Sequence, residues 1–213
     1  NLGGDTMLKS IQAFIITLTF TAFTFATDGF FISEYGEADG GNHKYIEFFN
    51  GTSADLDLSN FQWVRTGNNA TDWETFVGLS GTLSAGDVYV ICNGQSNQTI
   101  LDECDLISSS ANFNGDDAMG LLDASGNTLD AIGAVEGIDP GADENGQTDP
   151  GTAWTWDGGQ TRNGTLIRNA DVSDGNDGIW VGNESEWTFY DGNGNWDDVG
   201  SHICDACGGG DDG

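Results

Sequence analysis

The sequence predicts an all-β protein built as a two-sheet sandwich. After residue 27, short apolar runs alternate with Gly, Asn and Asp, and almost no segment has the 3.6-residue period of a helix. Twelve Phe, seven Trp and four Tyr supply large apolar rings for a core. About eight to ten short strands joined by short turns are typical of two packed sheets.

Eight segments have the composition of strands. One tripeptide, Ser125-Gly126-Asn127, separates two of them and predicts a tight hairpin turn. Several pairing orders fit the pattern. The expected strands are Phe30–Tyr35, Lys44–Asn50, Asn60–Thr66, Asp87–Cys92, Ala118–Asp123, Thr128–Ala134, Thr165–Arg168 and Glu186–Tyr190.

The segment Val88–Cys92 is apolar on both of its alternating faces. A sandwich strand usually shows one polar face to water, so either this strand is central with a covered outer face, or that face meets a partner. The candidate cover is Glu136–Gly159, which is acidic and Gly-rich but contains Trp154 and Trp156. We expect one of these two rings to pack over the sandwich.

The N-terminal residues resemble a secretory signal. Residues 1–26 are interpreted as a translated leader followed by a signal peptide that starts at Met7, with one basic residue, an apolar run and cleavage after Ala26. A membrane anchor is disfavoured because the run is short for a hydrocarbon core of roughly 30 Å. We therefore expect a secreted, extracellular protein with no membrane span, a domain at 27–202, and a Cys-, Gly- and Asp-rich tail or linker at 203–213.

The charge is strongly negative. The chain has 35 Asp and Glu against 5 Lys and Arg, a net charge of −30. Loss of residues 1–26 removes Asp5 and Lys9, which leaves the net charge unchanged. Binding to nucleic acid or to anionic lipid needs clustered Lys and Arg, so the composition argues against both classes of partner. The surface should instead attract cations.

Four cysteines in an exported chain lie in an oxidising environment. Cys92 and Cys104 bracket a polar segment and could close a small loop, and Cys204 and Cys207 form a C-x-x-C. A lone C-x-x-C is at most half of a zinc site. Local disulfides are therefore the favoured interpretation, although the sequence leaves all three connectivities open.

Several phrases occur in a fixed order along the chain. They include Phe31-Ile32-Ser33-Glu34-Tyr35, the run from Lys44 to Thr52, the run from Leu79 to Ile91, Phe113 to Ala118, and Gly164 to Arg168. Together they resemble the lamin-tail domain of exported microbial proteins, over nearly all of residues 28–202. The resemblance implies an immunoglobulin-like β-sandwich and a non-catalytic module, with no catalytic residues to carry over. The long acidic, Gly-rich loops that we expect here are more elaborate than the family needs.

The sequence offers little for catalysis. Only His43 and His202 could serve as an imidazole base or ligand, and no G-x-S-x-G, H-E-x-x-H or phosphate-binding motif occurs. We predict that the protein is not an enzyme. No cofactor is expected, with calcium as the one alternative.

Two acidic loops could hold calcium. The first loop places oxygen-bearing side chains at alternating positions, as the start of an EF-hand loop does, but it lacks the Gly at the sixth position and the Glu at the twelfth. Turns favour the same residues for backbone reasons. The candidate ligands are Asp191, Asn193, Asn195 and Asp197, with Asp174, Asn176 and Asp177 as a weaker set.

Two further expectations concern single residues. Arg168 ends one apolar strand and Glu47 lies within another. We predict that Arg168 pairs with a carboxylate at the sheet margin, with Glu47 as the favoured partner. Five Asn-x-Ser/Thr triplets would mark exposed turns if the protein is glycosylated. They are Asn50, Asn69, Asn97, Asn163 and Asn183.

These observations favour an exported, non-catalytic module that binds a protein, cell-surface or matrix partner, with self-association left open. One alternative is an accessory domain of a larger secreted hydrolase or nuclease. The other is a calcium- or carbohydrate-binding domain. The carbohydrate alternative depends on tryptophan rings that lie in water, the candidates being Trp154, Trp156, Trp180 and Trp196.

Overall fold

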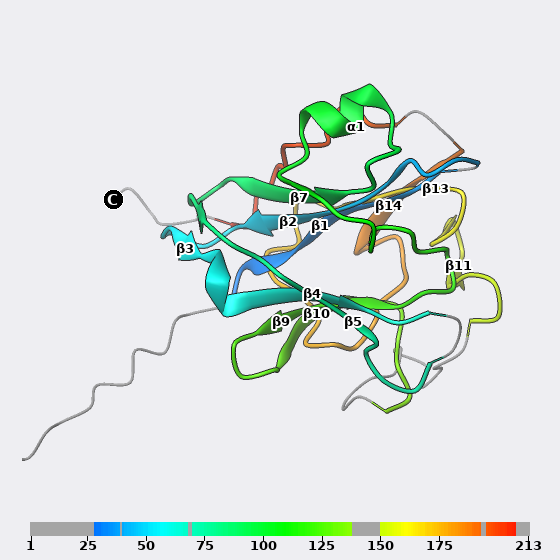
Figure 1. Cartoon of the computed structure of the whole chain (residues 1–213), viewed down its shortest axis with the longest axis horizontal. Helices are drawn as coiled ribbons and strands as arrows, with labels where there is room; N and C mark the ends of the chain where they lie inside the picture. Colours follow the sequence, from blue (N-terminus) through cyan, green and yellow to red (C-terminus); the bar gives the residue numbers. More distant parts are fainter. Residues whose placement is uncertain (1–27, 39, 68–69, 138–149, 193–194, 208–213) are drawn as a thin grey trace, which may run out of the picture.

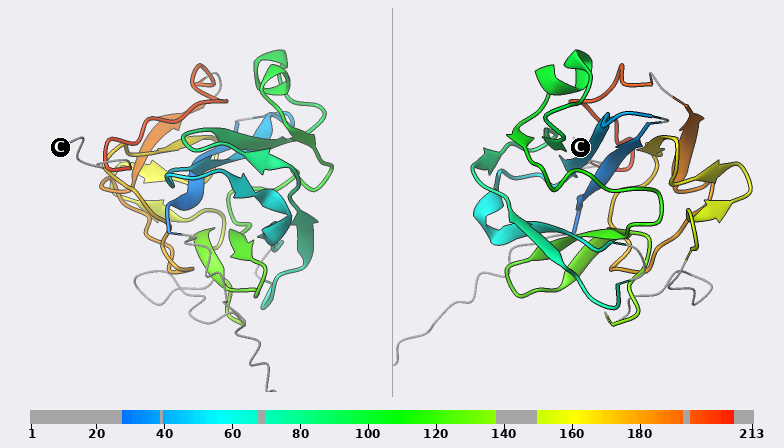
Figure 2. Two further views of the ribbon diagram at one scale, coloured as in Figure 1. Left: turned by 90° about the vertical axis from the view of Figure 1, so that its left-hand side faces the viewer. Right: turned by 45° about the vertical axis from the view of Figure 1, so that its right-hand side comes forward.

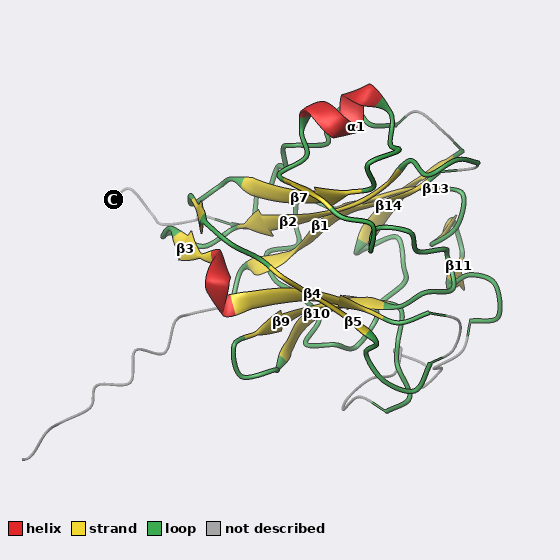
Figure 3. Cartoon of the chain, in the orientation of Figure 1, coloured by secondary structure: helices red, strands yellow, loops and turns green. Residues whose placement is uncertain are grey.

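A computed structural model describes residues 28–38, 40–67, 70–137, 150–192 and 195–207. Two β-sheets are stacked face to face, with loops around their edges (Figures 1 and 3). The larger sheet contains, in spatial order, β14 (Trp187–Asp191), β13 (Gly164–Arg168), β1 (Phe30–Glu37), β2 (Lys44–Asn50), β7 (Val88–Cys92) and β8 (Leu106–Ile107). The smaller sheet contains β10 (Thr128–Ile132), β9 (Met119–Asp123), β4 (Phe61–Arg65) and β5 (Thr75–Gly78).

The remaining elements are short. Two-stranded ribbons join β3 to β6 and β11 to β12, and none of the helices in the described ranges is long and apolar enough to cross a bilayer. These elements are β3 (Leu56–Asp57), the 3-10 helix η1 (Leu58–Asn60), β6 (Thr82–Leu83), α1 (Gln98–Asp102), β11 (Thr155–Trp156) and β12 (Gly159–Gln160). The predicted signal segment, residues 1–26, and the end of the tail, residues 208–213, lie outside the described residues.

The all-β, two-sheet prediction is confirmed. Each of the eight expected segments forms a strand, and no end differs from the expected one by more than two residues. The hairpin between β9 and β10 is also confirmed, and the Asp123 carboxylate accepts hydrogen bonds from the backbone N–H groups of Ser125 and Asn127. The sequence pattern missed β5, α1 and the two-residue strands, because segments this short show too few alternations to stand out.

The main core lies between the two sheets and is rich in aromatic rings. Phe30 of β1 packs edge-on against Phe61 of β4, with 4.8 Å between ring centroids. Tyr35 stacks on Phe113 at 5.0 Å, and Trp63 of β4 lies fully buried beside them. Contacts between large rings from both layers bury much apolar area, which holds the layers together.

The outer face of the larger sheet is also buried, as the apolar β7 segment predicts. Its side chains, among them Val88 and Val90, form a second cluster with Ile100 of α1 and with Trp196 and Val199 of the C-terminal segment. Figure 2 shows α1 and that segment on the same side of the sheet. The strand β7 is therefore central, between β2 and β8, with a covered outer face.

The two tryptophans of the proposed cover, Glu136–Gly159, do not lie in the cluster on the outer face of the larger sheet. Trp154 is buried in the main core, and Trp156 packs against that core. Residues 138–149 of the segment lie outside the described residues. Trp154 fits because Gly133 has no side chain. A Cβ at Gly133 would lie 2.4 Å from the Trp154 indole nitrogen.

Both disulfides are local, which settles the connectivity. Cys92, at the end of β7, is bonded to Cys104 after α1, and Cys204 is bonded to Cys207. All four cysteines lie in or against the cluster on the outer face of the larger sheet. The first bond therefore holds the α1 segment on the strand that it covers.

Replacing Cys92 and Cys104 together by Ser should lower the free energy of unfolding by about 3 kcal/mol, because the chain-entropy model assigns roughly that to a loop of this length. The residues are 12 positions apart. The matched control is the Cys204→Ser/Cys207→Ser pair, whose three-residue separation should give a smaller loss. Urea unfolding measures both. An equal or larger loss in the control would contradict this assignment.

Candidate functional site

Basic side chains are scarce, and the fold uses most of them internally. Four lie outside the N-terminal 26 residues: Lys44, Arg65, Arg162 and Arg168. Three of the four form ion pairs with carboxylates. Most of the positive charge in the described residues therefore lies in ion pairs within the fold.

Arg168 and Asp130 form a fully buried ion pair between the two sheets. Arg168 lies at the end of β13 in the larger sheet, Asp130 lies in β10 of the smaller one, and both side chains are 0% exposed. The guanidinium also contacts Glu186 at 2.7 Å, donates to the Ile32 carbonyl at 3.1 Å and lies 4.0 Å from the Trp187 ring centroid. Several partners thus compensate for the loss of water around this cation.

The predicted pairing of Arg168 with Glu47 is wrong. The Glu47 carboxylate accepts hydrogen bonds from the Ser33 hydroxyl at 2.7 Å and from the Gly200 N–H at 2.8 Å. Gly200 belongs to the segment covering the outer face of the larger sheet, whereas Arg168 reaches Asp130 in the smaller sheet. Adjacent residues of a strand point to opposite faces, and the sequence alone did not fix which face each side chain takes.

Glu47 belongs to a pair of buried glutamates. Glu34 lies directly opposite it on β1, and the two residues are 1% and 0% exposed. Burial raises the pKa of Glu47 to about 8. Burial, and then repulsion from Glu47, raises the pKa of Glu34 well above its usual value, while the Tyr45 hydroxyl donates to its carboxylate. At neutral pH this pair therefore retains protons and carries less than its full negative charge.

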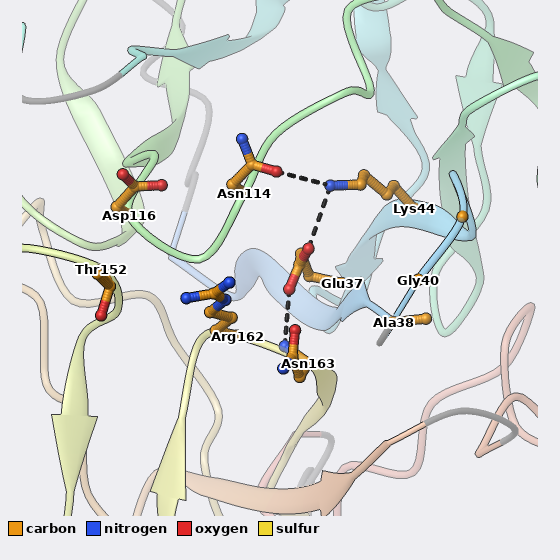
Figure 4. Close-up of a pocket in the computed structure, with 10 residues that line it drawn as sticks. Glu37, Ala38, Gly40, Lys44, Asn114, Asp116, Thr152, Arg162 and Asn163 are labelled. Carbon is orange, nitrogen blue, oxygen red and sulfur yellow. Dashed lines mark hydrogen bonds and ion pairs between the residues drawn. The ribbon is translucent and has the colours of Figure 1, made fainter.

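A polar pocket of about 490 Å³ lies where β1 ends and β2 begins (Figure 4). The Lys44 ammonium donates to Glu37 at 3.1 Å and to the Asn114 side-chain oxygen at 3.2 Å, and it also donates to the Phe113 carbonyl. The second oxygen of Glu37 accepts from the backbone N–H of Asn163 at 2.7 Å. One wall of the pocket is therefore a continuous polar network.

The loop at 112–117 contributes Asn114 and Asp116 to the pocket lining. Arg65 of β4 holds this loop through the Asn112 side chain at 2.7 Å and Asp117 at 3.5 Å. Gly115 lies against Arg162, where a Cβ would come within 2.4 Å of the arginine Cβ. Glycine at this position therefore permits the loop to lie directly against Arg162.

Arg162 differs from the other three cations. Its side chain is exposed in the pocket, and it has no ion pair with any residue that the structure describes. Thr152 and Asp116 line the same pocket. A guanidinium presents several N–H donors in a planar fork, which suits a carboxylate of a bound molecule. Sequence reasoning missed this site, although the scarcity of cations was a signal for it.

The two histidines have packing roles. His202 lies against Phe49 and Phe31, at 4.9 Å and 5.9 Å between ring centroids, and burial lowers its pKa to about 4. His43 packs edge-on against Trp196 at 5.3 Å. All seven tryptophans lie within the described residues, and none is exposed. The tryptophan rings therefore form no open platform for a sugar.

Part of the weaker calcium candidate forms turns. The Asp174 side chain accepts from the N–H groups of Gly29 and Gly175, and the oxygen of Asn176 accepts from those of Ala131 and Gly178. Within the described ranges, no three His, Cys, Asp or Glu side chains are grouped to hold a metal. Asn193 lies outside those ranges. Calcium binding stays a prediction for both loops, with the candidate ligands Asp191, Asn193, Asn195 and Asp197, and Asp174, Asn176 and Asp177.

One glycosylation expectation conflicts with the structure. Asn50 is fully buried, and its amide donates to the carbonyls of Ala54 and Leu83, so it does not mark an exposed turn. Asn97 is exposed and caps α1, while Asn163 and Asn183 are partly exposed. Asn69 lies outside the described residues.

Arg168→Ala should lower the free energy of unfolding by about 3–5 kcal/mol, because it leaves Asp130 buried without its cation. Arg65→Ala provides a matched control at a pair whose cation is 16% exposed, and it should cost less. Denaturant unfolding at neutral pH gives both values. Equal losses for the two variants would contradict the claim that the Arg168–Asp130 pair stabilises the fold more than the Arg65–Asp117 pair does.

The buried glutamates predict a pH dependence of stability. Folded Glu47 keeps its proton up to about pH 8, whereas the unfolded chain releases it near its ordinary pKa, so its contribution to stability falls as pH rises through this range. Glu47→Gln should therefore lose less stability than the wild type between about pH 5 and about pH 9. Parallel slopes for the two proteins would contradict the assignment.

Comparison with known families places residues 24–136 in the Lamin Tail Domain. This range is more than half of the chain and includes every strand from β1 to β10. No curated protein matches the chain. The matched segment and the two-sheet architecture agree with an immunoglobulin-like sandwich. The chain belongs to the lamin tail domain family.

Proposed function

We propose that this protein is an exported, non-catalytic module that binds a partner at the cell surface or in the extracellular matrix. Its family is generally non-catalytic and of a protein-interaction type, which supports the binding role. Two disulfides support an oxidising location, since such bonds are rare in reducing compartments. The N-terminal segment resembles a secretory signal peptide, which also supports export.

The pocket at the β1–β2 end carries the binding proposal. Its walls are fixed by the contacts of the Lys44 nitrogen with Glu37 and Asn114 and by the contacts of Arg65, so the site is formed before any partner arrives. Into this site projects Arg162, an unpaired cation among the described residues of a chain with a net charge of −30. An acidic group of the partner is the complementary contact, because a guanidinium binds carboxylates through charge-assisted hydrogen bonds.

The same site would serve an accessory domain of a larger exported hydrolase, with the partner then being the substrate or the catalytic domain. The two versions differ in what occupies the pocket. They share the requirement that a carboxylate can bind at Arg162.

Sodium acetate is a minimal probe of this requirement. Titration at constant ionic strength, followed by NMR of the backbone amides, should give saturable shifts confined to residues near Arg162, Asn114 and Thr152. Arg162→Ala should weaken binding by about tenfold, the effect of losing one charge-assisted contact. Asp116→Asn is the matched control and should strengthen binding, because it removes a negative charge from the same pocket. Shifts that are scattered, or unchanged in Arg162→Ala, would refute the proposal.

A further inference from the structure

The Lys44 side chain makes an unusual set of contacts for an exported protein with few cations. It is buried, with a side-chain exposure of 6%, and Glu37 beside it is 8% exposed. Its nitrogen lies 3.1 Å from a Glu37 oxygen and 3.2 Å from the amide oxygen of Asn114. Figure 4 shows the lysine nitrogen between these two side chains. A primary amine, a carboxylate and a carboxamide thus meet at one point.

We propose that Lys44 and Asn114 join through an intramolecular amide bond, with Glu37 as the catalytic base. The Lys44 nitrogen attacks the side-chain carbonyl carbon of Asn114 and forms a C–N bond. The bond between that carbon and the Asn114 amide nitrogen breaks, and ammonia leaves. No oxidant, reductant or further reactant is needed for this exchange of one amide for another.

Proton transfer explains why Glu37 is required. The lysine must lose a proton to become a nucleophile, and the Glu37 oxygen at 3.1 Å is positioned to accept it. The lysine nitrogen loses two protons in all, because the ammonium carries three hydrogens and the amide keeps one. Glu37 passes both in turn to the departing nitrogen, which leaves as ammonia and takes up the second proton as ammonium. The Glu37 carboxylate is regenerated, and the protons balance.

The fold supplies the proximity. The reacting residues are 70 positions apart, but β2 and the 112–117 loop bring them within hydrogen-bond distance. An amine and an amide that the fold holds in contact react as if each were present at very high concentration, and this offsets the low reactivity of the amide. The Phe113 carbonyl accepts from the same nitrogen, and the Phe113 ring centroid lies 5.9 Å away, so the amine is oriented and partly shielded from water. Asn114 is exposed, which gives ammonia a path to solvent.

The bond would connect the two sheets covalently. Lys44 begins β2 of the larger sheet, and the Asn114 loop leads directly into β9 of the smaller one. The two disulfides lie together on the outer face of the larger sheet and do not make this connection. An amide between the layers would also persist under reducing conditions. Such a bond suits a structural module outside the cell.

Intact-mass spectrometry of the reduced, denatured wild-type protein is the direct test. The expected mass is lower than that of the reduced sequence by one ammonia. After digestion at acidic residues, a peptide containing Lys44 should be covalently joined to one containing Asn114. Lys44→Arg, Asn114→Ala and Glu37→Gln should each restore the full mass. Asn127→Ala removes a side-chain amide in the turn between β9 and β10, outside the pocket, and should keep the mass loss.

A competing reaction must be separated from the cross-link. Asn114 is followed by Gly115, and attack by the Gly115 backbone nitrogen would also release ammonia and give a succinimide ring. That product contains no joined peptide and would persist in Lys44→Arg. A wild-type protein of full mass, or a mass loss without a joined peptide, would overturn the proposal. A joined peptide in folded Glu37→Gln would overturn the role given to Glu37.

Discussion

The buried ion pair between Arg168 and Asp130 is the constraint on which the sandwich depends. Apolar contact between two sheets is strong but has little directional preference. The pair adds direction, because a guanidinium from β13 must meet a carboxylate from β10 with no water available to either. The contacts of Arg168 with Glu186, Ile32 and Trp187 fix its position further. The relative placement of the sheets follows from satisfying these charges.

Internal cations also join segments elsewhere in the molecule. A net charge of −30 opposes compaction through self-repulsion, so internal positive charge is valuable where segments meet. Lys44 and Arg65 hold the 112–117 loop from two sides, one from each sheet. The protons retained by Glu34 and Glu47 reduce repulsion beneath the C-terminal segment. Most of the other Asp and Glu side chains in the described ranges are exposed to solvent, where hydration and salt moderate their repulsion.

The sequence predicted the strands better than their faces. Short apolar runs between turn residues predict all eight of the longer strands. A bulge between Ile32 and Glu34 shifts the register of β1 against β2, and the local sequence pattern does not predict such a shift. The partner of Arg168 was therefore assigned to the wrong side of the sheet. The cover of β7 was also misplaced, because α1 is only five residues long and shows no helical period.

The pocket was harder still to foresee, since its residues come from β1, β2 and loops distant in sequence. Its formation depends on the two sheets remaining in one fixed arrangement. Native-state amide hydrogen exchange tests that arrangement most directly. If the polar contacts join the layers, the slowest amides of β1, β2 and β13 should share one opening free energy with those of β9 and β10. A distinctly lower opening free energy for the smaller sheet would contradict it.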